Sequence, residues 1–428
     1  MGRAAPADND GVTPIPTFRE VEDEAGGVLR SQGALAAILV DLEPLARIER
    51  SFGGSAYKGL REQVDPLMHE MKDRVRDGDI LTRDEREGDR FLLLLGPKRE
   101  SGPFRLADLR RLTERIEEFV APRIARITQP YLRERSAIDV GYGFVLYSPL
   151  ESPERQILRL IEDARQCAEL RNHDRERERR ETLLEIIHNY NVWTAFQPIV
   201  EIESRQVVGH EGLSRGPRGS DLESPGALFG LAGRCGVVEE LERACRRQAF
   251  RDWAVFGAPS RLFVNTVPAT VRDPSFLGRG VLDYLGEGQS PRFVTLEITE
   301  GQVIENLNLY REAMHPFIEL GFTFAIDDVG AGYSGLETIA NLGASYLKID
   351  MGLVRDVHQK RVSQQVVKAI LDMAASTGAT VIAEGIQTLE EAEALASLGV
   401  RYGQGYYFAR PIDPYGPKMK VVAKNAAS

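Results

Sequence analysis

The strongest constraint on the fold of this chain is a regular alternation of short apolar segments with segments of helical periodicity over residues 191–415. Strands and helices alternate in this way in a (β/α)8 barrel, which typically takes roughly 250 residues, so the pattern predicts an α/β barrel. The predicted strands are residues 194–200, 206–214, 261–265, 292–297, 322–327, 345–349, 379–383 and 401–408. The predicted helices are residues 225–235, 238–250, 274–285, 302–320, 336–342, 362–377 and 389–398. No helical segment separates the first two strands, so they should form a hairpin and make one barrel strand antiparallel.

A second, shorter alternation precedes the barrel and predicts a separate α/β domain over residues 31–152. Its predicted strands and helices are residues 35–41, 44–77, 91–95, 106–120 and 138–147. Residues 1–30 begin with a polar, proline-rich stretch and are predicted to be a disordered tail. Residues 416–428 are expected to form a C-terminal tail.

Residues 153–190 are predicted to be a helical linker between the two domains. Within it, residues 171–182 contain no apolar side chain and mix arginines with aspartate and glutamates. A basic patch for nucleic acid is one interpretation. A solvated helix face with internal ion pairs is favoured, because the acids are interleaved with the arginines.

Composition excludes several classes of function. The formal net charge is −10, so the chain is not built to wrap polyanions, and no nucleic-acid polymer is expected as a partner. No apolar segment approaches the length of a membrane span, and the N-terminal segment lacks a signal-peptide core, so a soluble cytoplasmic protein without a membrane partner is expected. Cys167, Cys235 and Cys245 form no CxxC pair and are expected to be reduced thiols.

Polar side chains end most of the predicted barrel strands. They are Glu211, Asn265, Glu297, Asp327, Asp328, Lys348, Glu384 and Gln404. One acid after one strand is usually a helix cap or a turn residue. Acids and amides that end most strands would converge at one end of the barrel and repel one another unless a cation lay between them. Their hard oxygen ligands suit Mg²⁺ or Mn²⁺.

The pair Asp327-Asp328 could serve two metal ions, with one carboxylate bridging them. Enzymes that cleave or form phosphate esters often use two such ions. Lys348 could orient the attacking water or neutralise the phosphate. A structural lysine paired with a neighbour is the alternative, which is disfavoured because Asp350 lies two residues on, on the same face. The glycine-rich stretch that follows the pair would let backbone approach a ligand closely.

These residues carry a pattern that resembles the EAL family of cyclic di-GMP phosphodiesterases. The matching stretches appear in the family's order across the whole barrel: FQPIV (196–200), EGLSR (211–215), FVN (263–265), LEITE (296–300), DDVGAGYSGL (327–336), LKID (347–350), AEGIQT (383–388) and GQGYYFARP (403–411). The resemblance implies hydrolysis of cyclic di-GMP to the linear dinucleotide pGpG, with two Mg²⁺ or Mn²⁺ ions in each active site.

The resemblance also implies a role for each matching residue. The first metal would be held by Glu211, Asn265, Glu297 and Asp327, and the second by Asp327, Asp328 and Glu384. Lys348 and Gln404 match positions that hold or polarise the hydrolytic water, and Glu300 matches the glutamate that anchors the glycine-rich loop. The substrate contacts are assigned to Gln197, Leu213, Arg215 and Asp350, with Arg215 on a phosphate.

Two positions depart from the family pattern. Gly212 stands where the Glu-Ala-Leu motif that names the family has alanine. Because that position bears no functional group, little effect on activity is expected. Val329 stands where phenylalanine is usual, which could loosen the glycine-rich loop and lower activity. No metal ligand is lost.

The domain at residues 31–152 more faintly resembles the GGDEF family of diguanylate cyclases, whose fold resembles the palm of nucleotide cyclases. The matching stretches are VDLEPLARIERSFG (40–53) and REGDRFLLLL (86–95). Glu87 and Arg90 replace a glycine and a glutamate of the family's signature, so the resemblance implies a degenerate, regulatory domain without cyclase activity. Asp41 and Asp89 could still hold a metal, and GTP as a regulatory ligand stays open.

Four further positions of this domain bear on the resemblance. Glu49 and Arg50 fall where the family reads guanine. Arg76 and Asp79 have the spacing of the family's inhibitory site, but they lie two residues too far upstream, so a charged turn is favoured.

Three hypotheses follow. The leading one is metal-dependent hydrolysis of cyclic di-GMP under control of the N-terminal domain. The alternative is a non-catalytic cyclic di-GMP receptor or a protein-interaction module. A diguanylate cyclase is disfavoured by Glu49, Arg50 and Arg90. A homodimer is expected from the resemblance, because barrels of this family often pair near the loop after the aspartate pair.

Overall fold

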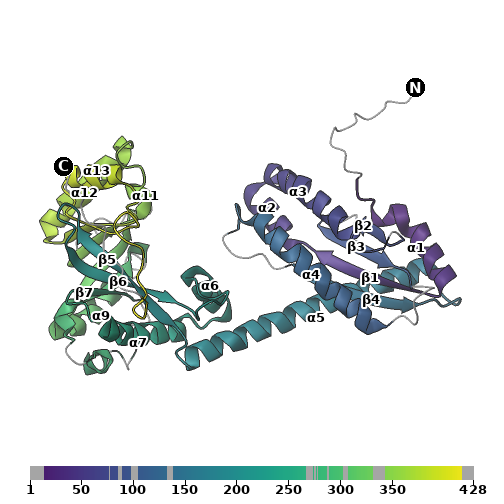
Figure 1. The fold of residues 1–428 in the computed structure, drawn as a ribbon, viewed down its shortest axis with the longest axis horizontal. Helices are drawn as coiled ribbons and strands as arrows, with labels where there is room; N and C mark the ends of the chain where they lie inside the picture. Colours follow the sequence, from purple (N-terminus) through teal and green to yellow (C-terminus); the bar gives the residue numbers. More distant parts are fainter. Residues whose placement is uncertain are drawn as a thin grey trace. The chain divides into compact units, whose positions relative to one another are not determined.

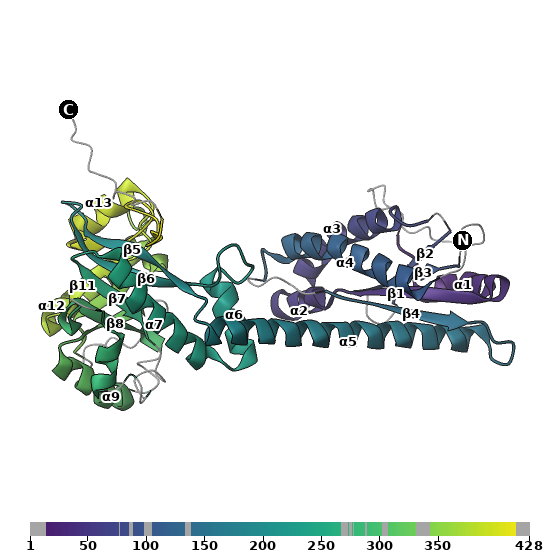
Figure 2. The same ribbon diagram turned by 60° about the horizontal axis from the view of Figure 1, so that its bottom comes forward.

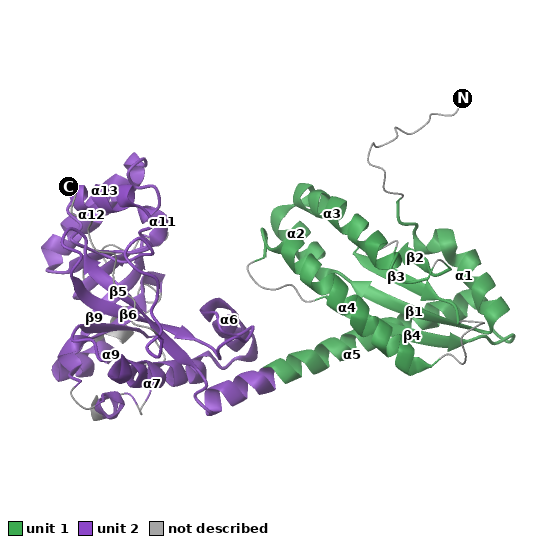
Figure 3. Cartoon of the chain, viewed as in Figure 1, with its two compact units in different colours: residues 1–179 green, residues 180–428 purple. Residues whose placement is uncertain are grey.

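The computed structural model describes residues 14–76, 78–84, 89–97, 105–132, 138–266, 273, 276, 278–286, 289–301, 307–330 and 343–416, without the side chains of residues 307–311. The chain divides into two compact units, Met1–Arg179 and Arg180–Ser428, coloured separately in Figure 3. Among the described residues, no helix combines the length and apolar character needed to cross a membrane.

The first unit is a four-stranded antiparallel sheet in the order β2-β3-β1-β4 with helices on both faces. Its elements are α1 (Phe18–Gln32), β1 (Ala34–Asp41), α2 (Glu43–Phe52), α3 (Gly54–Lys72), β2 (Ile80–Arg83), β3 (Arg90–Leu95), α4 (Leu106–Thr128), β4 (Asp139–Leu146) and the start of α5 (Pro153–His188). The central strand β1 is buried on both faces, because Ile38 packs with α3 and α4 while Leu39 packs with α1 and α5. Figure 2 shows α3 and α4 along one face of this sheet and α5 along the other.

The first half of helix α5 belongs to the core of the first unit. Ile157, Leu160 and Ala164 are fully buried against the sheet. Two glycines of β4 make this close approach possible: a Cβ on Gly141 would lie 2.2 Å from the carbonyl oxygen of Ala164. The helical prediction for residues 153–190 is therefore confirmed, but much of this segment is core rather than linker.

The polar part of α5 is tied to its own unit by ion pairs. Arg171 donates to Glu117 of α4 at 2.8 Å, and Arg175 pairs with the same carboxylate and with Asp139 of β4. The favoured interpretation, a solvated helix face, holds for residues 176–182, which are exposed. The partners of Arg171 and Arg175 come instead from α4 and β4, because the helix lies along the sheet here.

Other predictions for the first unit need correction. Residues 18–30 are not a disordered tail, because they form most of α1, which buries Val21, Ala25 and Leu29; residues 1–13 lie outside the described residues. The single helix predicted at 44–77 is two helices, broken at Gly53 where φ is +85°. Strand β2 was not predicted.

The turn before β2 contains Arg76 and Asp79, the two residues that have the spacing of an inhibitory site in GGDEF proteins. The carboxylate of Asp79 accepts a hydrogen bond from the backbone N–H of Arg76 at 3.1 Å. The favoured interpretation of this pair as a charged turn is thus confirmed.

The second unit is a closed eight-stranded barrel in the order β10-β11-β12-β5-β6-β7-β8-β9. Its strands are β5 (Trp193–Glu201), β6 (Val207–Arg215), β7 (Arg261–Asn265), β8 (Val294–Thr299), β9 (Thr323–Val329), β10 (Tyr346–Ile349), β11 (Thr380–Ala383) and β12 (Tyr402–Gly403). Only β5 is antiparallel to its neighbours. The predicted barrel, its hairpin and its one antiparallel strand are confirmed.

The described helices of the barrel unit pack outside the strands (Figure 1). They are α6 (Pro225–Cys235), α7 (Val238–Phe256), η2 (Gly278–Tyr284), η3 (Pro291–Phe293), α9 (Leu307–Leu320), α11 (Met351–Val354), α12 (Arg361–Thr377) and α13 (Leu389–Leu398). Inside the barrel, Ile199, Phe263, Ala325 and Ile382 form one apolar cluster from alternate strands. This layer is typical of a barrel interior, and it supports the polar residues at the strand ends.

Several elements of the barrel unit differ from those predicted from the sequence. The strand predicted at 401–408 ends at Gly403, because the chain then turns. The turn brings Gly405 against the backbone of Ile386, where a Cβ would lie 2.0 Å from the carbonyl oxygen. The described part of the helix predicted at 274–285 is a 3₁₀ helix. The helix predicted at 336–342 lies outside the described residues, as do residues 302–306.

Candidate metal centre

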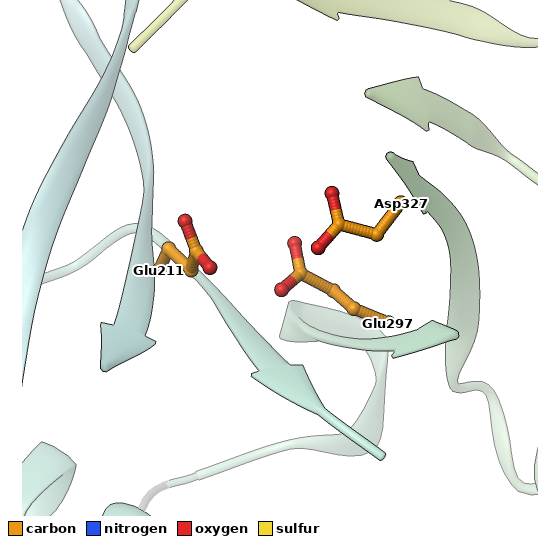
Figure 4. Close-up of side chains that lie close together, drawn as sticks. All are labelled: Glu211, Glu297 and Asp327. Carbon is orange, nitrogen blue, oxygen red and sulfur yellow. The ribbon is translucent and has the colours of Figure 1, made fainter. Parts of the chain in front are cut away.

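Three carboxylates from three of the barrel strands face one another at the C-terminal end of the parallel strands. Glu211 comes from β6, Glu297 from β8 and Asp327 from β9, and Figure 4 shows their side chains turned toward a common centre. Each offers one oxygen within 4.8 Å of the others. A second group of the same compactness is formed by Asp327, Asp328 and Glu384. Asp327 belongs to both groups.

Two consecutive residues of a strand normally point to opposite faces. Here the backbone of β9 departs from a regular strand at the aspartate pair. Leu347 and Ile349 of β10 pair with Ile326 and Val329 of β9, so β9 carries one extra residue between the paired positions. Asp328 adopts the left-handed conformation, with φ of +57°, which is uncommon for a residue with a side chain. This bulge explains how both carboxylates reach the same centre.

Lys348 lies in the middle of the acidic cluster. Its side chain is 0% exposed, and its Nζ lies 2.7 Å from Glu297, 2.6 Å from Glu384, 3.3 Å from Asp327 and 3.5 Å from Glu211. Burial alone lowers the pKa of Lys348, but the four surrounding acids raise it well above its usual value. The lysine is therefore held as an ammonium ion.

The cluster carries more negative charge than this lysine neutralises. Burial raises the pKa of Glu297 well above its usual value; the charge of Lys348 opposes this rise and the neighbouring acids add to it. Burial also raises the pKa of Glu384 well above its usual value. Both oxygens of Glu297 are buried, and apart from the ion pair that Lys348 makes with one of them they have no hydrogen-bond donor within the described part of the chain. Buried carboxylates with so few donors fit a hard divalent cation.

Amide side chains link the cluster to the rest of the barrel. Gln404 donates to Glu211 at 2.6 Å and to the side-chain oxygen of Gln197 at 2.9 Å. Gln197 in turn donates to the carbonyl oxygen of Ala409 at 3.1 Å. Asn265 donates to Glu211 at 3.3 Å. These bonds fix the direction of the Glu211 carboxylate.

The residues beyond the aspartate pair occupy defined positions. Glu300 is buried and accepts a hydrogen bond from the backbone N–H of Gly330 at 2.9 Å, at the end of β9. Val329 is fully buried in the barrel core. The glycine-rich loop assigned to residues 327–336 is described only as far as Gly330, and the rest lies outside the described residues.

The positions assigned to substrate gather near the same end of the barrel. Arg215 ends β6; burial lowers the pKa of its guanidinium, while the charges of Tyr406, Glu223 and Glu211 partly offset this. Leu213 is half-buried on the same strand.

Asp350 has a local structural role. It caps α11 by accepting from the N–H of Gly352 at 2.8 Å, and its charge is among the causes that raise the pKa of Asp328, after burial and Asp327.

All the predicted ligands therefore meet at one centre. Sequence reasoning missed the Ala409 carbonyl, which no side-chain signal could reveal. It also did not anticipate that Lys348 would contact four carboxylates at once.

Comparison with known proteins identifies the barrel. A family model described as the EAL domain matches residues 180–411. A probable cyclic di-GMP phosphodiesterase of Escherichia coli, PdeB, is 30% identical over 242 residues, which cover 54% of this chain and 44% of that protein. An uncharacterised protein of Synechocystis is 26% identical over 429 residues, which cover 94% of this chain and 59% of that protein. The chain thus matches less than two thirds of the length of these relatives.

A solved structure shares the fold. The EAL domain of FimX from Xanthomonas citri, solved in complex with c-diGMP, has a TM-score of 0.51 and 22% identity to this chain. The match covers 57% of this chain and 98% of that structure. At this identity the likeness extends to the fold alone.

Proposed function

Because this chain belongs to the EAL domain family, we propose that it is a metal-dependent phosphodiesterase that hydrolyses cyclic di-GMP to the linear dinucleotide pGpG. The observation that carries the proposal is the pair of carboxylate groups that share Asp327 around a buried lysine. Relatives named as probable cyclic di-GMP phosphodiesterases support the choice of substrate.

The metal ions are proposed to be Mg²⁺ or Mn²⁺. Glu211, Asn265, Glu297 and Asp327 would hold the first ion, and Asp327, Asp328 and Glu384 the second. When bound, the two cations supply an activated water and stabilise the negative charge that develops on the phosphate.

The chain's own side chains hold and orient the reactants. Water adds to one phosphorus, the bond from phosphorus to the 3′ oxygen breaks, and that oxygen leaves with a proton as a hydroxyl group. Lys348 keeps its protons because the surrounding acids raise its pKa, so its ammonium is proposed to help orient the water and to offset negative charge on the phosphate. Gln404 is fixed by its bonds to Glu211 and Gln197, and it can orient the same water. Arg215 can bind a phosphate with two parallel N–H groups.

Four more residues complete the assignment. Gln197, Leu213 and Asp350 are proposed to contact the dinucleotide. Glu300 is proposed to couple the loop after the aspartate pair to the centre, through its bond to Gly330.

The first unit is proposed to be a degenerate GGDEF-like regulatory domain without cyclase activity. Its two candidate ligands already have protein partners: Arg90 donates to Asp41 at 2.6 Å, and the hydroxyl of Tyr57 donates to Asp89 at 2.6 Å. Arg61 lies 4.0 Å from the same Asp89 carboxylate. A metal ion with GTP would have to displace these contacts, so any binding there should be weak.

The product assay tests the proposal. The 428-residue chain is incubated with cyclic di-GMP and Mn²⁺, Mg²⁺ or EDTA, with and without GTP, and the products are separated by chromatography. Linear pGpG that forms only with metal is expected. Saturable binding with the dinucleotide recovered intact at high protein concentration would instead favour a receptor. Light scattering of the same samples tests the proposed homodimer.

A further inference from the structure

A short segment that follows the family match is built into the barrel. The EAL match ends at residue 411, and the described chain continues to residue 416. We call residues 412–416 the strap. Ile412 exchanges two backbone hydrogen bonds of 2.8 Å with Phe196 of β5, so the strap begins as an isolated bridge on the antiparallel strand.

A buried aspartate anchors the far end of the strap. The hydroxyl of Tyr415 donates to Asp252 of α7 at 2.6 Å, and the other oxygen of Asp252 accepts from the N–H of Thr194 at 2.8 Å. The side chain of Asp252 is 0% exposed. The hydrogen bond to Asp252, together with burial, raises the pKa of Tyr415 to about 12. Tyr415 therefore stays a hydroxyl donor at neutral pH.

Between these two anchors the strap holds an arginine. Both oxygens of Asp413 accept from the guanidinium of Arg218, and Oδ1 also accepts from the N–H of Tyr415 at 2.9 Å. The guanidinium lies 4.1 Å from the centre of the Trp193 ring. Surface ion pairs usually contribute little, but a two-pronged pair stacked on an aromatic ring is geometrically fixed.

Arg218 belongs to the loop at residues 216–223, which directly follows Arg215. The loop is closed on itself, because the N–H of Gly216 donates to the carbonyl of Glu223 at 3.1 Å and the N–H of Gly219 donates to the side chain of Glu223 at 2.9 Å. At Gly216, a Cβ would lie 2.1 Å from the carbonyl oxygen of Leu222. A loop this compact moves as one piece, so fixing Arg218 also restrains Arg215.

We propose that the strap is a positioning element that locks the 216–223 loop and thereby aims Arg215 at a phosphate of the substrate. Arg218, Asp413 and Tyr415 are its positioning residues, and the identity of the substrate rests on the proposed function. If Arg218 instead bound the phosphate directly, removing the Asp413 charge would release Arg218 for the substrate, so KM would fall rather than rise.

The test uses the Asp413→Asn and Tyr415→Phe variants of the 428-residue chain, with Glu201→Gln as the control. Glu201 also pairs with an arginine, Arg401, but it ends the antiparallel strand and so lies away from the metal centre. Hydrogen exchange of residues 216–223 is measured without ligand, and KM and kcat for cyclic di-GMP are measured with Mn²⁺. Faster exchange, with KM raised roughly five- to twenty-fold and kcat within about twofold, is expected for the strap variants only.

Each other outcome is decisive. Unchanged exchange in the loop, or faster exchange with unchanged KM, overturns the inference. A lower KM in Asp413→Asn overturns it in favour of direct binding by Arg218. If the unaltered chain neither cleaves nor binds cyclic di-GMP, the proposed function fails, and the exchange measurement alone decides whether the strap orders the loop.

Discussion

Replacing Lys348 by methionine should make the metal-free barrel much less stable. The side chain is fully buried, and its ammonium lies 2.6 to 3.5 Å from four carboxylates. Methionine fills a similar volume but carries no charge. Removing one partner from a buried ionic arrangement typically costs about 3–5 kcal/mol, because the remaining charge is left uncompensated. A loss of about this size in the free energy of unfolding is expected for Lys348→Met in EDTA.

Divalent metal should reverse much of this loss. A ligand that binds only the folded state stabilises it by about 2.7 kcal/mol at a hundred times its dissociation constant. In the variant, the cation would neutralise carboxylates that no longer have the lysine. Mn²⁺ should therefore raise the stability of Lys348→Met more than it raises that of the unaltered chain, while turnover stays lost because no ammonium attends the water and the phosphate.

Glu297→Gln is the matched control, because it removes a charge of the opposite sign at an equally buried position. The pKa of Glu297 is raised in the folded state, chiefly by burial. Such a carboxyl contributes stability below its unfolded pKa of about 4.5, and that contribution is lost as pH rises through the folded value. In EDTA, Glu297→Gln should accordingly be more stable than the unaltered chain at pH 8 and lose that advantage at pH 4.

Urea denaturation followed by tryptophan fluorescence measures these effects. The chain has two tryptophans, Trp193 and Trp253, and both lie in the barrel unit, so the signal reports on the barrel. Titrations are run in EDTA and in Mn²⁺. Equal stability of Lys348→Met and the unaltered chain in EDTA would refute the view that the lysine compensates the acidic cluster. So would an identical response of the two proteins to Mn²⁺.

Three further predictions concern other parts of the chain. Glu211→Ala should abolish cleavage of cyclic di-GMP in the product assay, with the circular dichroism spectrum unchanged; retained turnover would mean that the metal site is misassigned. Gly141→Ala should destabilise the first unit by about 1–3 kcal/mol in a urea titration followed by circular dichroism, because its Cβ would overlap the α5 backbone. Gly59→Ala, with open space around it, should stabilise this unit slightly. Burial raises the pKa of Cys245 to about 12, so iodoacetamide at pH 8 should label the half-buried Cys235 in the folded protein and reach Cys245 only in urea.

The sequence was sufficient for the barrel because its strands carry a short-range signal. Segments such as β8 and β9 are largely apolar and carry an acid near their C-terminal end, and the register of parallel strands brings all those ends to one side. The absence of a helix between β5 and β6 was likewise enough to predict the antiparallel strand. Predictions failed where the local pattern was weak, as in α1, whose amphipathic residues follow a proline-rich stretch.

Sequence by itself therefore determined which side chains assemble at the centre, since each lies in its own strand or directly after it. Only the tertiary structure decided how they are arranged. The bulge at Asp328 turns two consecutive carboxylates toward one centre, and closure of the barrel brings Lys348 within reach of four acids. Closure also places Asp413 on Arg218, 195 residues away along the chain. Such contacts depend on how distant strands close on one another, and no local periodicity encodes them.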